Sequence, residues 1–301
     1  MQYNKRLLLM QTLSTQTLRF LKHAQSARLS LPKRVRAVGL MGQELDQLLT
    51  WSPTVSPDGP VPAASVLPKV AGLNLALLLD EATQLVHTQL LPRIRRYRVQ
   101  IVAIEQLGEA QFAWLWRYFQ QQIYPLLTPF AIDSGRPFPF LQEKRLNFLV
   151  VLQSNNKLYE LEQYGVVQIP SRLPRLIQTQ PCLPPPSRTR NRTPIRCLVW
   201  REEIVRYFLP VLFSGVSVKA AYQFRLLRAP LPTHPAPMIA LDRRANSIKG
   251  PISQVAIEKT MPLHLRQWLS NHLSVNMDRV LACAPPLGLG DLCELADYLQ
   301  P

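Results

Sequence analysis

The side chains best suited to chemistry in this sequence are arginines, which gather in two segments that contain no acidic residue. Residues 1–40 carry eight Lys and Arg residues and residues 169–201 carry seven, so together they account for 15 of the formal net charge of +16. Charge concentrated in this way predicts an anionic partner, such as a phosphate polymer, a nucleic acid or a membrane surface. The alternative is a solvated basic surface that only aids solubility. The candidate polyanion-binding residues are Arg34, Arg36, Arg188, Arg190 and Arg192.

The last three candidates alternate along a Pro-rich stretch of residues 178–197. Prolines favour an extended backbone and neighbouring arginines repel one another, so we expect this stretch to be a surface loop. Residues two apart in an extended chain point the same way. Arg188, Arg190 and Arg192 would therefore line one edge of the loop, where they would follow a linear polyanion.

Other kinds of chemistry are excluded by what the sequence lacks. Among its 11 glycines there is neither a G-x-x-x-x-G-K-[ST] nor a G-x-G-x-x-G motif, so the common nucleotide-binding loops are absent. The four cysteines form no C-x-x-C pair and the five histidines form no H-E-x-x-H motif. We therefore expect no metal site, no catalytic residue and reduced thiols. No apolar run reaches the ~18 residues of a membrane span and no secretory signal is evident, which predicts a cytoplasmic protein.

The elements that must position these side chains change character near residue 100. Apolar residues at helical spacing predict helices over residues 6–24, 33–50 and 65–97. The apolar face of the second helix is formed by Val35, Val38, Met41, Leu45, Leu48 and Leu49. Further along, the expected strands are 99–104, 146–153, 165–169, 223–227 and 254–258, the expected helices are 105–123, 202–213 and 263–273, and a polar tail follows Gly290. This pattern predicts an α+β protein with a helical domain at 1–103 and an α+β domain at 104–301.

Five collinear segments of the second half resemble the middle, or head, domain of polyphosphate kinase, the ATP–polyphosphate phosphotransferase family. They are IYPLLTPFAIDSGRPFPFLQEKRLNFLV from Ile123, YGVVQIPSRLPRLIQ at 164–178, LVWREEIVRYFLPVLFSGVSVKAAYQFRLLR at 198–228, VAIEKTMPLHLRQWLSNHL at 255–273 and PLGLGDLCELADY at 286–298. LSTQTLRFLKHAQ at 13–25 and SLPKRVRAVGLMGQELDQLL at 30–49 resemble the family's N-terminal domain less closely. This makes the basic first 40 residues part of a folded domain and not an organellar leader.

The resemblance implies phosphoryl transfer by a histidine that attacks the γ-phosphate of ATP, with Mg²⁺, in a catalytic half that this sequence does not cover. It also implies that the N-terminal domain lends an Asn to the nucleotide. Glu44 stands at that position, and the acid of the same motif is present as Asp46. A carboxylate only accepts hydrogen bonds and repels a triphosphate, so we expect weak nucleotide contact here. We expect ATP and Mg²⁺ only in an assembly with a catalytic half, and no activity from this chain alone.

Three functional hypotheses follow. The first is a truncated or degenerate polyphosphate kinase relative that binds polyphosphate or another polyphosphate kinase subunit without catalysis. The second is one subunit of a split polyphosphate kinase, with the catalytic half encoded separately. The third is a basic nucleic-acid-binding protein, against which stands the absence of any recognised nucleic-acid-binding module.

Overall fold

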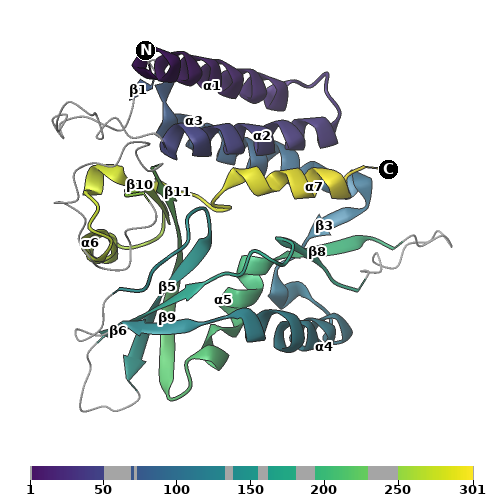
Figure 1. The fold of residues 1–301 in the computed structure, drawn as a ribbon. Helices are drawn as coiled ribbons and strands as arrows, with labels where there is room; N and C mark the ends of the chain where they lie inside the picture. Colours follow the sequence, from purple (N-terminus) through teal and green to yellow (C-terminus); the bar gives the residue numbers. More distant parts are fainter. Residues whose placement is uncertain are drawn as a thin grey trace.

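The structure is a computed structural model, and it describes residues 2–50, 69–70, 73–132, 138–154, 162–180, 194–229 and 250–300. Helices form the upper layer of the molecule in Figure 1, and a twisted sheet with flanking helices lies below them. The described chain is thus an α+β protein, as the sequence predicts. No described helix has the length and apolar character needed to cross a membrane.

The upper layer begins with two packed helices, α1 (Gln2–Gln25) and α2 (Leu31–Thr50). All six apolar residues expected to form the buried face of α2 are buried, which confirms that face. α1 contributes Leu13, Leu21 and Ala24 to the same core. The layer continues with a short antiparallel pair, β1 (Lys69–Val70) and β2 (Leu73–Asn74), and with α3 (Leu75–Leu85).

The predicted long helix at 65–97 is only partly correct. α3 begins at Leu75, and it is followed by a π-helical turn, Val86–Leu90, and a 3₁₀ segment, Leu91–Tyr97. Pro92 lies in the first turn of that segment, where its missing N–H is tolerated but a regular α-helix could not run through. Arg98 then adopts a left-handed conformation that ends the helical stretch.

A six-stranded sheet forms the centre of the lower layer, in the order β11-β10-β9-β5-β6-β4. Its pairs are antiparallel except β10–β11, which is parallel. The strands are β4 (Pro129–Ile132), β5 (Leu146–Ser154), β6 (Glu162–Gln168), β9 (Val216–Arg228), β10 (Ile252–Glu258) and β11 (Val280–Cys283). This sheet contains all four of the strands predicted at 146–153, 165–169, 223–227 and 254–258. Strand β9 is much longer than expected, because Gly215, at φ +85, turns the chain directly into it.

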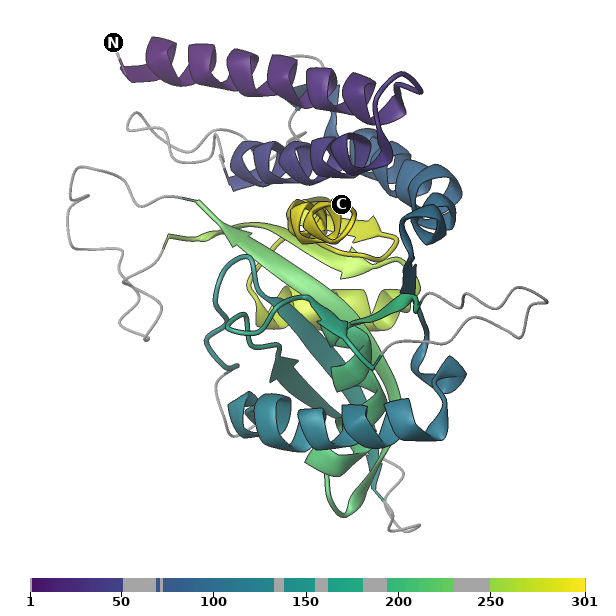
Figure 2. The same cartoon turned by 90° about the vertical axis from the view of Figure 1, so that its right-hand side faces the viewer.

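Strand β5 is buried on both faces. Phe148, Val150 and Leu152 belong to the core shared with α5 (Arg201–Leu212), whereas Leu149 and Val151 pack in the core shared with α6 (Leu263–His272). Alternate residues of a strand point to opposite faces, so one continuous apolar run serves both cores. Figure 2 shows the sheet between its helices, with α4 (Glu109–Tyr118) along the lower side.

A second, three-stranded sheet has the order β3-β8-β7, built from β3 (Val99–Ile101), β8 (Arg196–Trp200) and β7 (Leu176–Gln178). Strands β3 and β8 are parallel, and β7 and β8 are antiparallel. The arginines of the predicted loop, Arg188, Arg190 and Arg192, lie outside the described residues.

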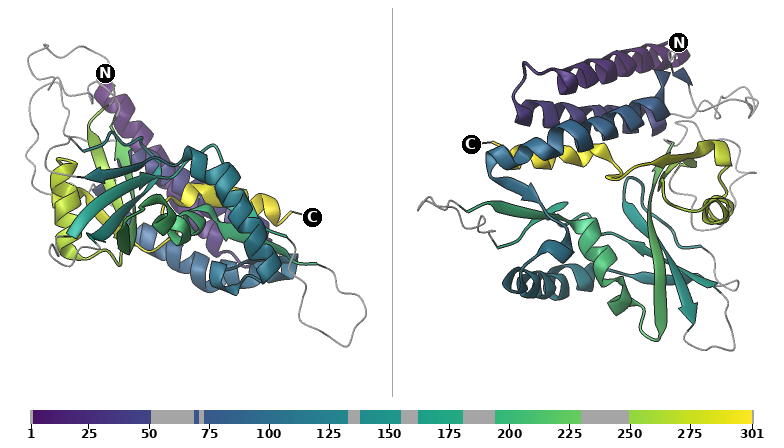
Figure 3. Two further views of the ribbon diagram at one scale, coloured as in Figure 1. Left: turned by 90° about the horizontal axis from the view of Figure 1, so that it is seen from below. Right: turned by 180° about the vertical axis from the view of Figure 1, so that it is seen from behind.

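The last described segment does not form the polar tail predicted after Gly290; it forms helix α7 (Leu292–Tyr298), which packs on α2. Leu292, Leu295, Ala296 and Leu299 are buried at helical spacing, a pattern that was present in the sequence. α2 admits α7 closely because it has glycines at the contact. A Cβ on Gly39 would lie 2.5 Å from Cys293 Sγ, and one on Gly42 would lie 2.5 Å from the backbone N of Gly290. Figure 3 shows α7 beside α2 and α3 in the upper layer.

Candidate functional site

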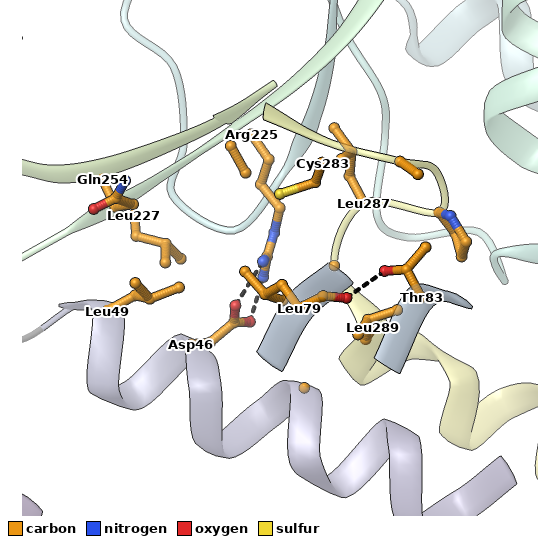
Figure 4. A pocket seen from close by; sticks show the side chains of 15 residues that line it. Asp46, Leu49, Leu79, Thr83, Arg225, Leu227, Gln254, Cys283, Leu287 and Leu289 are labelled. Atoms are coloured by element: carbon orange, nitrogen blue, oxygen red, sulfur yellow. Dashed lines mark hydrogen bonds and ion pairs between the residues drawn. The ribbon is translucent and has the colours of Figure 1, made fainter. Parts of the chain in front are cut away.

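Asp46 of α2 and Arg225 of β9 form a bidentate ion pair between the helical layer and the sheet (Figure 4). Arg225 Nη1 lies 2.6 Å from Asp46 Oδ1, and Nη2 donates to Oδ2. The Asp46 side chain is 14% exposed and that of Arg225 is 10% exposed. Two parallel hydrogen bonds between a guanidinium and a carboxylate fix the orientation of both groups. The motif acid Asp46 therefore holds the two layers in register.

The space around this pair is small. A cavity of about 30 Å³ lies beside it, lined by residues that include Leu49, Leu79 and Cys283. Figure 4 shows these side chains around the Asp46–Arg225 pair. A volume of this size holds a water molecule but no nucleotide. Burial raises the pKa of the Cys283 thiol to about 12, so this cysteine is not a nucleophile at neutral pH.

A second buried arginine, Arg175, holds the chain segment that leads into α7. Its guanidinium donates to Glu202 Oε1 at 2.6 and 2.8 Å, to the carbonyl oxygen of Leu287 at 2.7 Å and to that of Gly288 at 2.8 Å. Burial by itself lowers the pKa of Arg175, but Glu202 and Asp291 outweigh it and raise that pKa. The guanidinium of Arg225 lies on the other side of Gly288, where a Cβ would meet its Cζ at 3.3 Å. Gly288 is thus held between two arginines.

Arg175 and Arg225 both contact the segment that leads into α7, but the sequence analysis did not single out either residue. Arg175 ends the sequence IPSRLPR and Arg225 lies in FRLLR, both within segments that resemble the family. The resemblance marked the segments, but only the fold shows that both arginines converge on the PLGLGDL segment. Arg206 of α5 forms another ion pair, with its Nη2 2.7 Å from Oε2 of Glu258 in β10.

Glu258 also accepts hydrogen bonds from the N–H of Gln223 at 3.0 Å and the hydroxyl of Thr260 at 2.8 Å. Burial by itself raises the pKa of Glu258, but these bonds and Arg206 lower it overall. A depression of about 390 Å³ lies nearby, lined in part by Trp200, Glu203 and Arg206. Burial raises the pKa of Glu203.

The two residues predicted at the nucleotide position do not form one site. They are two apart on α2, and residues at that spacing do not face each other on a helix. Asp46 is held by Arg225, whereas Glu44 is half-buried and its Oε2 has no hydrogen-bond partner in the described part of the chain. Burial raises the pKa of Glu44. The structure therefore separates the motif acid from the position expected to contact a nucleotide.

The predicted polyanion-binding residues of the first segment also differ from each other. Arg34 is buried, and its side chain donates to the carbonyl oxygen of Ala24 at 2.6 Å and to Gln89 Oε1 at 3.0 Å. Arg36 is 45% exposed and pairs with Asp297 of α7. In this arrangement Arg36 is accessible to a ligand and Arg34 is not.

Among the described residues, no group of three or more His, Cys, Asp or Glu side chains is arranged to hold a metal ion. Cys283 and Cys293 are free, but Cys197 is disulfide-bonded. The expectation that all four thiols are reduced is therefore wrong. Spacing along the sequence does not reveal such a pairing, because a disulfide depends on which cysteines the fold brings together.

The sequence of this chain is similar to those of known polyphosphate kinases. A family profile described as the polyphosphate kinase middle domain matches residues 110–229. The polyphosphate kinase of Lactiplantibacillus plantarum is 27% identical over 94% of this chain and 40% of its own length, and that of Parasynechococcus marenigrum is 29% identical over 79% of this chain and 34% of its own length. The polyphosphate kinase of Halalkalibacterium halodurans is 35% identical over 48% of this chain and 19% of its own length.

The fold agrees with these sequence matches. The crystal structure of the polyphosphate kinase of Porphyromonas gingivalis superposes with a TM-score of 0.72, at 19% identity, over 96% of this chain and 41% of that one. The chain thus spans about 40% of the length of the first of these relatives and of this solved structure. Residues 110–229 therefore match the polyphosphate kinase middle domain, and the chain as a whole is similar in sequence and in fold to part of several polyphosphate kinases.

Proposed function

We propose that this chain is a module of the polyphosphate kinase family that binds polyphosphate and does not transfer phosphate by itself. The observation that carries the proposal is the distribution of charge. Residues 1–40 and 169–201 hold 15 of the +16 net charge with no acid among them. Part of that charge serves the fold, since Arg34, Arg175 and Arg201 are buried and hydrogen-bonded. The rest supports attraction to a linear polyanion.

Polyphosphate is a better candidate than nucleic acid for two reasons. The relatives of this chain are named polyphosphate kinases. The stretch Arg188–Arg192 also contains no aromatic residue, whereas proteins that bind single-stranded nucleic acids usually stack bases on aromatic side chains. Phosphate contacts alone therefore account better for this composition.

Binding of fluorescently labelled linear polyphosphate to the full chain, measured at several salt concentrations, tests the proposal. Counterion release predicts that log K falls by roughly 0.7 per phosphate contact against log salt. Unlabelled single-stranded DNA of equal charge serves as the competitor. If polyphosphate does not bind even at low salt, the proposal is wrong, and if DNA displaces it more strongly than polyphosphate does, the nucleic-acid hypothesis replaces it.

We expect ATP to bind more weakly than about 1 mM, which corresponds to about −4 kcal/mol. Asp46 is already bonded to Arg225, and the carboxylate of Glu44 offers no hydrogen-bond donor to a base. Calorimetry on the wild type and on Glu44→Asn measures this directly. Micromolar binding by the wild type would contradict the expectation, and a gain in affinity in Glu44→Asn would identify a decayed nucleotide site.

A second proposal is that the chain acts as one subunit of a split polyphosphate kinase, in which ATP and Mg²⁺ bind only with a separately supplied catalytic part. Its support is that the chain spans about 40% of its first relative, and that the exposed apolar side chains Leu77 and Leu263 are 64% and 61% accessible. Polyphosphate synthesis should then require both chains. Synthesis by this chain alone would contradict both proposals, whereas synthesis only in the mixture selects the second.

We also propose a cytoplasmic location, against which the disulfide at Cys197 stands, since disulfides are rare in the cytosol. Cell fractionation tests it. Recovery of the protein outside the cytoplasmic fraction would overturn this part without affecting the binding proposal.

A further inference from the structure

A polar depression of about 170 Å³ lies where the start of β5, the turn before β7 and the start of α5 meet. Its lining includes three basic residues, Lys144, Arg145 and Arg201, together with the hydroxyl-bearing residue Ser171. The volume has room for several water molecules, and hence for a small tetrahedral oxyanion. The buried arginine Arg175 and the acids Asp291 and Glu294 complete the polar part of the lining.

The acids in this depression already have donors. Asp291 Oδ2 accepts a hydrogen bond from Arg175 Nη1 at 3.1 Å. The two carboxylate oxygens of Glu294 each accept a backbone N–H, one from Arg175 and one from Leu176, both at 2.8 Å. Arg175 is itself bonded to Glu202. The lining as a whole still has more cations than acids, since Lys144, Arg145, Arg175 and Arg201 face only Asp291 and Glu294.

Arg201 is a buried cation of this lining that makes no direct ion pair with a described carboxylate. It is only 6% exposed, and its Nη1 donates to the carbonyl oxygens of Leu173 and Pro174. Its Nε has no partner among the described residues, and no described carboxylate forms an ion pair with it. A buried N–H donor without an acceptor is unfavourable, so an anion that accepts from this Nε would be stabilised. Burial lowers the pKa of Arg201 and Arg175 adds to that effect, whereas Glu202, Asp291 and Glu294 act in the opposite direction.

The two remaining cations are presented on a fixed turn. Lys144 has a left-handed backbone with φ +61; its N–H donates to the carbonyl oxygen of Leu226 at 2.8 Å, and its own carbonyl accepts Arg225 Nε at 3.2 Å. Arg225 in turn is held by Asp46. The side chain of Lys144 is exposed and that of Arg145 is half-buried, so both can reach a ligand in the depression. Because hydrogen bonds already fix the backbone of this turn, little further ordering of the turn is needed when a ligand binds to the two side chains.

We propose that this depression is a binding site for a phosphoryl oxyanion, in which Lys144, Arg145 and Arg201 supply the charge and Ser171 a hydroxyl donor. The ligand is either free orthophosphate or a phosphate unit of a polyphosphate chain, since both present the same tetrahedral oxygens. The site goes beyond the proposed function, because its residues are not those of the Arg188–Arg192 stretch and it does not require that stretch to bind anything.

The test compares the full chain with the double variant Lys144→Asn/Arg145→Gln. Asn tolerates the left-handed backbone at position 144, so the turn should fold normally while both charges are removed. Arg117→Gln, which removes one exposed charge on α4, is the control variant. Binding of orthophosphate and of linear polyphosphate is measured by calorimetry at constant ionic strength, with chloride as the reference anion. Circular dichroism checks that each variant is folded.

We expect at least one of the two phosphate ligands to bind the wild type and the control equally, and the double variant about tenfold or more weakly. Orthophosphate binding identifies a discrete phosphate site, whereas binding of polyphosphate alone identifies a subsite for a polymer. Equal binding by the double variant, or no phosphate binding by the wild type, overturns the proposal. If polyphosphate binds wild type and double variant equally, the proposed function stands and this site fails. If orthophosphate alone binds and the double variant loses it, the site stands and polyphosphate binding fails.

Arg201→Met provides an independent check from the buried side of the depression. Loss of phosphate binding in a folded Arg201→Met variant supports the site. If this variant folds and binds phosphate like the wild type, then Arg201 is not part of the site and the proposal is wrong as stated.

Discussion

Within the described residues, two ion pairs connect α2 to other elements, and they differ in their surroundings. Asp46–Arg225 joins α2 to the central sheet, and both side chains are less than 15% exposed. Arg36–Asp297 joins α2 to α7, with side chains that are 45% and 66% exposed. Both connect residues far apart in the sequence. Only the first is bidentate and continues into a further contact, from Arg225 to the carbonyl oxygen of Lys144.

The difference in exposure between the two pairs indicates which charged residues of α2 stabilise the fold. An exposed ion pair gains little, because water screens it and both side chains lose freedom. In a buried pair, each charge depends on the other, because removal of one leaves the second without solvent or partner. Asp46 is therefore a structural residue of the interface between the layers, and the resemblance that marked it as part of a nucleotide motif does not by itself give it a role in binding.

Removal of the arginine from the buried pair should give the largest loss of stability. Arg225→Met keeps most of the side-chain volume but leaves Asp46 in a poorly solvated position without its cation. We expect a loss of about 3 kcal/mol in the free energy of unfolding, measured by urea denaturation. The accompanying loss of the hydrogen bond to Lys144 should also loosen the 142–146 turn.

The double variant Asp46→Leu/Arg225→Met is the control for this interpretation. Because it removes both charges, it should recover much of the stability that the single variant loses. If the double variant is as unstable as Arg225→Met plus Asp46→Leu added together, the two residues do not act as a pair and the comparison above is wrong.

A third ion pair, Arg206–Glu258, sharpens the comparison through pH. The folded-state pKa of Glu258 lies below its ordinary value of 4.5, chiefly because Arg206, the Gln223 N–H and the Thr260 hydroxyl overcome the effect of burial. Its contribution to stability is therefore fully present above about pH 4.5 and is lost as the pH falls through the lower folded-state pKa. Urea unfolding of the wild type and Glu258→Gln between pH 3 and 7 should show the two stabilities converging at the acid end. A gap that stays constant with pH would contradict this.

The exposed pair should matter least among the three. Arg36→Ala removes the partner of Asp297, which remains hydrated at the surface. We expect a change of no more than about 1 kcal/mol in the free energy of unfolding, and a smaller one at high salt. A loss as large as that of Arg225→Met would show that the α2–α7 contact depends on this ion pair and not on its apolar packing.

Whether the sequence predicted a feature depends on how far apart along the chain the interacting residues lie. The buried face of α2 follows from periodicity within one helix, so Val38, Met41 and Leu45 were predictable. The two sides of β5 follow equally from local alternation. The Asp46–Arg225 pair joins residues 179 positions apart, and nothing local indicates it. The same holds for Arg175, whose partners lie up to 119 residues away.

Some errors had a local cause instead. The helix expected at 65–97 was extended through Pro92 because apolar residues continue at helical spacing beyond it, although proline begins a new segment there. α7 was missed because its charged residues Glu294 and Asp297 made the end of the sequence read as a tail. Its buried residues nevertheless repeat at three and four positions.

The smallest effect on stability, and the largest on binding, is expected from Arg188, Arg190 and Arg192. If these arginines contact a polyanion, replacing all three by Ser should reduce the slope of log K against log salt for polyphosphate by about 2, at roughly 0.7 per contact. The thermal midpoint should stay nearly unchanged, because residues 188–192 include no apolar side chain to bury. Lys144→Asn/Arg145→Gln separates the two candidate sites, since it should weaken phosphate binding without changing the contribution of the three arginines. An unaltered salt slope in the triple variant would show that these arginines touch no polyanion. The exposed basic residues of 1–40 would then be the next to replace: Arg19, Lys22, Arg28, Lys33 and Arg36.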